Sequence, residues 1–205
     1  AEPAAPRRAY HLETGDIVEE EVATLRRLVS EFSSFAKLPE ATIEPADLSD
    51  FVVDAGRSLA AVAEESQTED DGARVAITTE TPGAPLPVRI DAMMLKRCVD
   101  NLVRNAVQAV RAHRPETGGR VVIASRREGA SAVLEVRDDG PGVPEGDRGR
   151  VFDPYFTTKA DGTGLGLAIV KKVVLEHDGE ILCESTPEGG AAFRIRLPLR
   201  KTGQV

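Results

Sequence analysis

The segment from Ala92 to His113 carries an apolar face along its whole length, and it restricts the possible fold more than any other part of the chain. The apolar side chains that recur at helical spacing are Met94, Leu95, Cys98, Leu102, Ala106 and Val110. Asp91, directly before this segment, is a suitable N-cap. A helix with one apolar face must bury that face against another layer of secondary structure.

Strand patterns lie on both sides of this helix and indicate that the other layer is a sheet. The segments with strand patterns are 72–80, 86–90, 119–128, 131–140, 179–186 and 191–199. We expect one further helix over 46–65, with Asp47 or Ser49 as its N-cap, and another that follows a glycine run and ends near His177. This order predicts an α+β fold, a two-layer α/β sandwich with one mixed sheet that helices cover on one face.

An amphipathic helix is also expected before this domain, between Asp16 and Leu38. Its seam residues alternate steps of four and three: Val18, Val22, Leu25, Val29, Phe32 and Ala36. Leu28 and Phe35 widen the seam, which favours packing in a bundle over a two-stranded coiled coil. This helix either packs on its own globular domain or forms half of a helical hairpin that dimerises.

Composition excludes several classes of protein. No apolar run approaches the length of about 18 residues that a transmembrane helix needs, and the N-terminus lacks the apolar core of a signal peptide. The net charge of −8 argues against a nucleic-acid partner, although a small site with local positive potential can still bind a phosphorylated ligand. Cys98 and Cys183 lie inside regular patterns, so we expect buried free thiols in a reducing compartment, with one disulfide between them as the alternative.

Two asparagines interrupt the apolar helix at 92–113. Asn101 and Asn105 are four residues apart and therefore share a helix face. They are a pair of hydrogen-bonded amides in the core, a polar patch at an edge or, through their carbonyl oxygens, ligands for Mg²⁺. The pair alone does not decide between these alternatives.

A second polar segment, "RDDGPGVP", follows a strand directly. Asp138 is expected at the end of this strand, with Gly140 and Gly142 in a tight turn after it. The segment is either an ordinary loop or a place where a carboxylate accepts a hydrogen bond from an exocyclic amine such as adenine N6. In the second case the glycines would let the base lie close to the backbone.

Two more segments complete the set of candidate functional motifs. "FDPYFTTK" either anchors a loop through its aromatic residues or brings threonines and a lysine to phosphates. "GTGLGL" places three glycines on alternate positions before a helix, which suits a flexible joint or a phosphate cradle. It is not a dinucleotide-binding fingerprint, because the third glycine comes one position early, and no Gly-Lys-Ser/Thr follows as in a P-loop.

Together these four segments resemble, in order, the N, G1, F and G2 boxes of the GHKL superfamily of ATP-binding domains, which includes sensor histidine kinases. The resemblance covers about Ala46 to Leu199 and implies the Bergerat ATP-binding fold, with ATP and Mg²⁺ as cofactors. It implies that Asp138 binds adenine, that Asn105 is the Mg²⁺ ligand, and that Asn101 lies near the phosphates or the metal. The other residues that it assigns to the nucleotide are Arg104, Gly140, Gly142, Thr157, Thr158, Lys159, Gly162, Thr163, Gly164, Leu165, Gly166 and Leu167.

The resemblance also separates kinases from ATPases. Hydrolysing members place a Glu four residues before the metal-binding Asn, and this chain has Asn101 there. A carboxamide cannot act as a general base at neutral pH, and Asp100 lies on another helical face. The expected function is therefore that of a histidine protein kinase of a two-component system, with Asn101, Asn105 and Lys159 as its catalytic residues. A nucleotide-binding regulatory module, or an ATPase without phosphotransfer, is the alternative.

The substrate histidine itself is not expected in this chain. No histidine lies in a phosphoacceptor motif, so His11, His113 and His177 are expected at the surface. The chain thus resembles a fragment whose partners are an acceptor hairpin in trans or elsewhere in its protein, and a response regulator. "LVSEFSSFAKLP" resembles the end of the second hairpin helix in nitrogen-regulation sensor kinases of the NtrB/NtrY type.

This resemblance gives the expected organisation of the chain and its location. We expect a disordered leader (1–15), a second dimerisation helix that could form a homodimer (16–39), a linker (40–46), the ATP-binding catalytic domain (47–200) and a tail (201–205). The expected location is cytoplasmic, within a sensor whose other parts can be anchored in the membrane. Thr157 to Gly164 is expected to form a lid and its hinge.

Overall fold

The computed structural model describes residue 22 and residues 40–67, 74–159 and 162–200. The predicted leader, the N-terminal helix apart from Val22, and the C-terminal tail lie outside these residues. Within the described part, no helix is long and apolar enough to cross a membrane.

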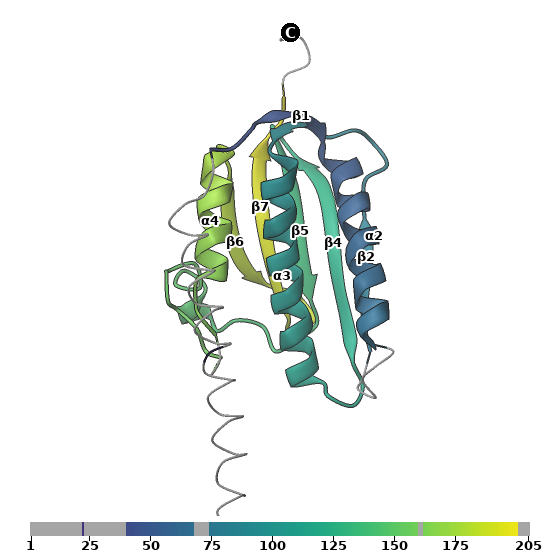
Figure 1. Ribbon diagram of the computed structural model, residues 1–205, viewed down its shortest axis with the longest axis vertical. Helices are drawn as coiled ribbons and strands as arrows, with labels where there is room; N and C mark the ends of the chain where they lie inside the picture. The colour runs from purple at the N-terminus through teal and green to yellow at the C-terminus, as the bar shows by residue number, and fades with distance from the viewer. Residues whose placement is uncertain (1–21, 23–39, 68–73, 160–161, 201–205) are drawn as a thin grey trace, which may run out of the picture.

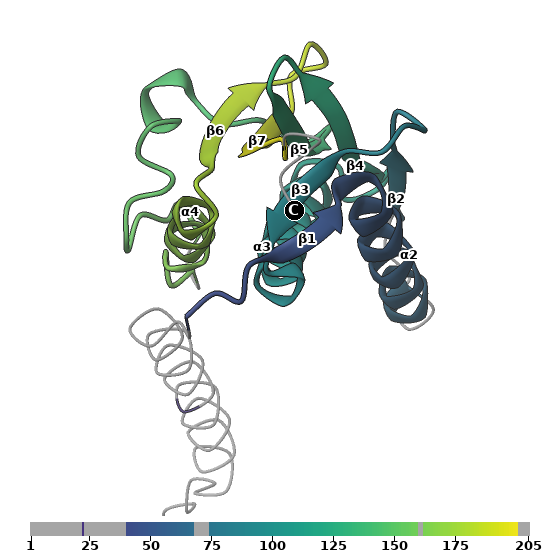
Figure 2. The ribbon, with the colours of Figure 1, turned by 90° about the horizontal axis from the view of Figure 1, so that it is seen from above.

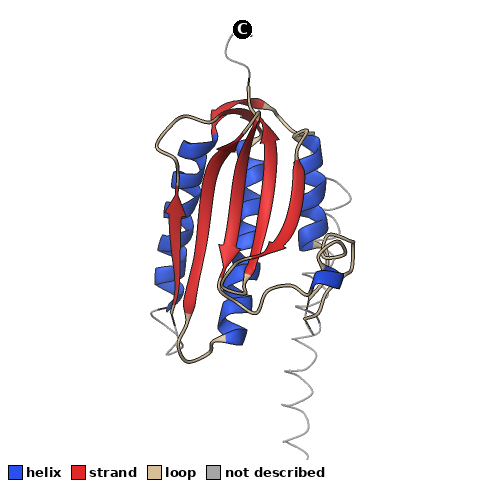
Figure 3. Ribbon diagram, turned by 180° about the vertical axis from the view of Figure 1, so that it is seen from behind, coloured by secondary structure: helices blue, strands red, loops and turns tan. Residues whose placement is uncertain are grey.

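A five-stranded mixed sheet forms one layer of the domain (Figures 1 and 3). Its strands, in spatial order, are β2 (Val75–Glu80), β4 (Gly119–Glu128), β5 (Ser131–Asp138), β7 (Ala191–Pro198) and β6 (Glu180–Ser185). Only the pair β2–β4 is parallel, and α3 lies in the connection between these two strands, as parallel pairing requires. The predicted fold class, a two-layer α/β sandwich with a mixed sheet, is confirmed.

Three helices form the second layer and lie on one face of the sheet (Figure 2). They are α2 (Leu48–Gln67), α3 (Ala92–His113) and α4 (Gly166–Glu176). The predicted cap of α3 is confirmed, since Asp91 Oδ1 accepts a hydrogen bond from Met94 N at 3.0 Å. Asp47 Oδ1 accepts one from Ser49 N at 2.7 Å, in the first turn of α2. Large apolar side chains fully buried in this domain include Leu95, Leu102, Ile123, Leu134 and Ile195.

A second, two-stranded sheet was not predicted. Strand β1 (Glu44–Asp47) pairs antiparallel with β3 (Pro87–Ile90), so the segment expected at 86–90 does not join the main sheet. The sequence "EPAD" of β1 has a proline, two acidic residues and no alternating apolar pattern, and for this reason it resembled part of a linker. Its partner lies about 40 residues further along the chain, beyond the reach of a local pattern.

The prediction for His177 was wrong. This side chain is only 3% exposed. Asp91 N donates to His177 Nε2 at 2.9 Å, and Nδ1 lies 2.7 Å from Val173 O, an arrangement that suits a neutral ring with its proton on Nδ1. The ring therefore joins the C-terminal end of α4 to the start of α3, a long-range contact that no local pattern announces. His113 is exposed as predicted, and His11 lies outside the described residues.

Both cysteines are buried free thiols, as predicted. Burial raises the pKa of Cys98 to about 12 and that of Cys183 to about 11, so neither thiol is reactive at neutral pH.

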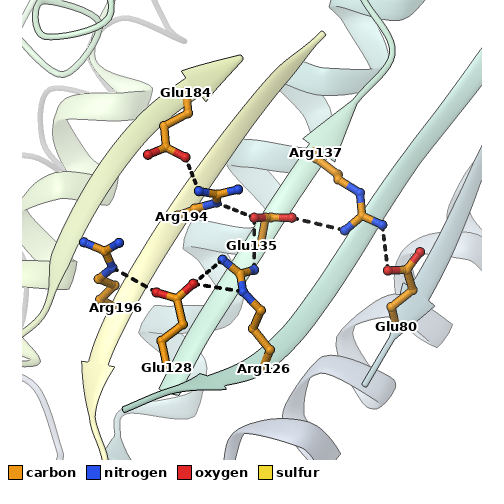
Figure 4. A network of polar contacts seen from close by, with 8 residues as sticks. All are labelled: Glu80, Arg126, Glu128, Glu135, Arg137, Glu184, Arg194 and Arg196. Atoms are coloured by element: carbon orange, nitrogen blue, oxygen red, sulfur yellow. Dashed lines mark hydrogen bonds and ion pairs between the residues drawn. The ribbon is translucent and has the colours of Figure 1, made fainter. Parts of the chain in front are cut away.

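A network of ion pairs covers the sheet face that carries no helix (Figure 4). At its centre lies Glu135, whose side chain is only 5% exposed and which pairs with Arg126, Arg137 and Arg194. The rest of the network consists of Glu80, Glu128, Glu184 and Arg196. Burial raises the pKa of Glu135, but the hydrogen bond from Arg194 and the other arginines outweigh burial and lower this pKa overall.

Replacing Glu135 by Gln is expected to lower the free energy of unfolding at pH 7 by about 3 kcal/mol, because three arginines lose their shared counter-ion. Chemical denaturation measures the difference. Because the folded state lowers this pKa, the stabilisation by the carboxylate is present above the unfolded pKa and is lost as the pH falls through the folded value. The difference between the two proteins should therefore shrink in acid. Glu128→Gln, at a side chain that is 37% exposed, is the control and should cost less than about 1 kcal/mol; equal losses would contradict the central role of Glu135.

Candidate functional site

The two asparagines of α3 contact each other as their spacing predicts. Asn105 Nδ2 donates a hydrogen bond to Asn101 Oδ1 at 3.3 Å, and both residues are half-buried. The Oδ1 atom of Asn105 faces a cation, because Lys159 Nζ lies 3.1 Å from it. The side-chain oxygen of Asn105 thus already accepts a hydrogen bond from a positively charged ammonium group.

Gly166, the first residue of α4, lies directly against Asn101. A Cβ atom on Gly166 would be 2.8 Å from both Oδ1 and Nδ2 of Asn101, so any larger residue at 166 would push the end of the Asn101 side chain away. The N-terminal end of α4, with its free N–H groups and positive dipole, therefore lies beside the amide pair of α3. Leu165 is buried before the helix begins, and Leu167 packs against the core.

The third and fourth motifs also contact each other. Tyr155 N donates to Gly164 O at 3.0 Å, and both residues have a φ of +67°. A Cβ atom on Gly164 would lie 2.4 Å from the carbonyl carbon of Tyr155, so glycine is required here for two reasons. Nearby, a Cβ atom on Gly162 would meet Thr157 Oγ1 at 2.2 Å, and Thr163 Oγ1 accepts from Leu165 N at 3.3 Å.

Asp138 ends β5 as predicted and is only 7% exposed. Its Oδ1 atom accepts hydrogen bonds from Gly140 N at 2.9 Å and from Ala191 N at 3.3 Å. Burial raises the pKa of Asp138, and these two N–H groups, which lower it, do not cancel the effect. With Oδ1 fixed in this way, Oδ2 is the atom that can accept a hydrogen bond from a ligand.

The turn after Asp138 is closely packed. Gly142 has a φ of +74°, and a Cβ atom on it would lie 2.5 Å from Gly189 O. A Cβ atom on Gly140 would be 3.4 Å from the Cβ atom of Ala109 on α3, so this turn lies against the helix that carries the asparagines. Helix α3 thus contacts three parts of the site in succession: the turn after Asp138 at Ala109, Lys159 at Asn105, and Gly166 at Asn101. These contacts span about 12 Å along the helix axis.

Some predicted residues make no contact with α3 or Asp138 through the side-chain interactions described above. Arg104, Thr157 and Thr158 have exposed side chains, and Arg104 lies on α3 one residue before Asn105. Thr157 Oγ1 accepts from Lys159 N at 3.1 Å, which shapes the loop before the lysine. Asp100 is engaged elsewhere, since Lys96 Nζ lies 3.0 Å from its carboxylate.

Sequence reasoning missed the turn between β6 and β7. Ala191 N contacts Asp138, and a Cβ atom on Gly190 would lie 1.9 Å from Asp138 O. Gly190 N also donates to the buried Thr186 Oγ1 at 2.9 Å. The glycine pair at 189–190, directly before a strand, was the available signal. Gln108, like Arg104 and Lys159, could reach phosphates by its sequence position, but the hydrogen bond that it accepts from Lys159 was not predicted.

The donor set suits Mg²⁺ held together with a phosphorylated ligand. The described residues contain no group of three or more His, Cys, Asp or Glu side chains that could form a complete metal site. Mg²⁺ commonly takes one or two protein oxygens and completes its coordination with phosphates and water. The oxygen of Asn105, which already accepts a hydrogen bond from an ammonium group, fits this pattern.

Comparison with known proteins agrees with this geometry. The family described as histidine kinase-, DNA gyrase B- and HSP90-like ATPase matches residues 90–201. The nitrogen regulation protein NtrY of Azorhizobium caulinodans is 35% identical over 92% of this chain, which covers 23% of NtrY. The sensor histidine kinase ZraS of Escherichia coli is 29% identical over 97% of the chain, which covers 40% of ZraS. The chain therefore spans less than half of the length of either relative.

Among solved structures, the catalytic domain of the histidine kinase ThkA is similar, with a TM-score of 0.62 and 30% identity. The match covers 77% of this chain and 95% of the ThkA domain. Together these findings confirm the resemblance that the four motifs indicated.

Proposed function

We propose that this chain, which belongs to the family of histidine kinase-, DNA gyrase B- and HSP90-like ATPases, transfers the γ-phosphate of ATP to a histidine of a sensor kinase. The observation that carries the proposal is the pair of amides on α3. Asn101 occupies the place beside the phosphate end of the site, against Gly166, and offers no basic group that could activate water. Asp100, its acidic neighbour, is paired with Lys96.

Each part of the site has a role in this proposal. Asp138 binds the exocyclic amine of adenine, and the turn through Gly140 and Gly142 lets the base approach the backbone. The phosphates lie toward the N-terminal end of α4, where free N–H groups and the helix dipole favour negative charge. Mg²⁺, when bound, neutralises charge that develops on the phosphates. Asn105 Oδ1 would hold the metal, and Lys159 would contact the phosphate oxygens.

Catalysis by such a site consists mainly of positioning. Phosphoryl transfer needs little covalent help from protein groups, so a site that fixes the γ-phosphate favours whichever acceptor is presented in line with it. An acceptor histidine is expected in a helical hairpin, in trans or in another part of the same protein. His177 cannot serve, since it is buried and both ring nitrogens are engaged.

The rest of the proposal concerns the protein around this domain. Residues 16–39 would provide the second helix of a dimerisation hairpin, and a response regulator would receive the phosphate. Because the site uses ATP and both thiols are free, we place the domain in the cytoplasm.

Phosphotransfer to a separate hairpin tests the function directly. The full chain, incubated with Mg²⁺ and γ-labelled ATP, should not label itself but should label the acceptor hairpin of an NtrY-type kinase with acid-labile phosphate. ATP hydrolysis without the hairpin should stay near the uncatalysed rate, since the site lacks a general base. Steady hydrolysis would contradict the kinase function, and nucleotide binding without transfer would instead support a regulatory module.

A further inference from the structure

Lys159 forms a bridge between two amide oxygens of α3. Its Nζ atom lies 3.1 Å from Asn105 Oδ1 and 2.6 Å from Gln108 Oε1. Asn105 and Gln108 are three residues apart, so their side chains lie on the same helix face and can bind one cation together. The shorter of the two hydrogen bonds is the one to Gln108.

The ammonium group is partly desolvated in this position. Although the residue as a whole is exposed, the end of its side chain lies against α3, and this burial lowers the pKa of Lys159. Two neutral amides accept hydrogen bonds from the ammonium, and no carboxylate of the described residues pairs with Nζ. Two hydrogen bonds thus fix the position of the ammonium group, but both acceptors are neutral, so another cation can displace it.

The same oxygen of Asn105 is the proposed ligand of Mg²⁺. A divalent ion on Oδ1 and an ammonium 3.1 Å from it would lie close together, and their repulsion makes simultaneous binding unfavourable. Gln108 does not contribute to the proposed metal site, yet it contacts the cation that must leave. It therefore affects the metal only through Lys159.

We propose that Gln108 is a positioning residue: it holds the Lys159 ammonium beside Asn105, and Mg²⁺ must displace this ammonium to bind Asn105. The inference rests on the proposed function, because it takes Asn105 as the metal ligand. Once displaced, the ammonium is free to contact the phosphates that arrive with the metal. Gln108 thereby sets the Mg²⁺ concentration that the site requires.

Two variants of Gln108 separate its acceptor oxygen from its shape. Gln108→Met keeps the length of the side chain but has no amide oxygen, whereas Gln108→Glu keeps an acceptor for Lys159. In protein without metal or nucleotide, hydrogen exchange at the amide of Lys159, which donates to Thr157 Oγ1, should be about three- to tenfold faster in the Met variant. The Glu variant should exchange as slowly as the unmodified chain, or more slowly. Equal exchange in the Met variant and the unmodified chain would overturn the inference.

A Mg²⁺ titration tests the competition itself. At a fixed concentration of a fluorescent ATP analogue, Gln108→Met should reach half-saturation at about three- to tenfold less Mg²⁺ than the unmodified chain, because a competitor has been weakened. A merely structural role would raise the requirement or leave it unchanged, and either result would overturn the inference alone. Absence of nucleotide binding by the unmodified chain would overturn the proposed function and this inference with it.

Discussion

Replacement of Asp138 by Asn is expected to weaken the binding of an ATP analogue by roughly 100-fold, the effect of losing a hydrogen bond to a charged acceptor in a buried site. Both N–H donors of the pocket, Gly140 N and Ala191 N, bind one oxygen of the carboxylate. In the variant, an NH₂ group replaces one of the two oxygens. It must then face either these two N–H groups or the exocyclic amine of adenine, and each arrangement sets a donor against a donor.

Asp139→Asn is the matched control for this measurement. Its carboxylate accepts from Arg120 N at 2.9 Å and lies 3.4 Å from Arg114, so it stabilises the end of the sheet where β4 begins and β5 ends, and it does not belong to the pocket. Fluorescence titration of both variants, together with their melting temperatures, distinguishes loss of the ligand contact from loss of the fold. Nucleotide affinity within a few-fold of normal in Asp138→Asn would contradict the assignment of adenine to this pocket.

The main layers of the domain could be predicted because local pattern determines them. The helix from Ala92 to His113 begins and ends where its apolar face and its cap indicated. Strand β5 ends at Asp138, where a pair of aspartates and a glycine turn follow a largely apolar run. In these segments the residues that end a helix or strand lie within a few positions of its apolar pattern. The local sequence is therefore sufficient to predict both the element and its ends.

What could not be predicted depends on contacts between distant segments. Strand β1 is stabilised by pairing with β3, and His177 by a hydrogen bond from Asp91, a residue 86 positions earlier. A polar tetrapeptide and a histidine near the end of a helix look the same in the sequence whether or not such a partner exists. The same limit applies to Gln108, since only the fold brings Lys159 to it across 51 positions.

The glycines of the fourth motif show both situations at once. Their number before a helix predicted a close approach of backbone, but not what approaches. At Gly166 the approaching group is the Asn101 side chain of α3, and at Gly164 it is the backbone of Tyr155. These contacts bring together the asparagine motif of α3, the segment "FDPYFTTK" and the glycine run "GTGLGL". For this reason the motifs were informative as an ordered set, although each of them alone was not.

Asn105→Ala is expected to remove the dependence of nucleotide binding on Mg²⁺ and to lower phosphotransfer to an acceptor hairpin by about 1000-fold, as the loss of an electrostatic contact to the reacting group typically does. The variant lacks the only amide oxygen of α3 that is both in contact with a cation and adjacent to Asn101 among the described residues. Titrations with and without Mg²⁺ measure the first effect, and transfer of labelled phosphate measures the second.

Asn105→Asp separates the oxygen from the rest of the side chain. Both variants lose the hydrogen bond from Nδ2 to Asn101, so any disturbance of the amide pair is common to them. Only the Asp variant keeps an oxygen where Lys159 and, in the proposed function, Mg²⁺ bind, and its negative charge should strengthen both contacts. It should therefore retain the Mg²⁺ dependence that the Ala variant loses. If both variants bind nucleotide with the Mg²⁺ requirement of the unmodified chain, the metal ligand is not Asn105, and the positive charge near the phosphates must be held by other groups.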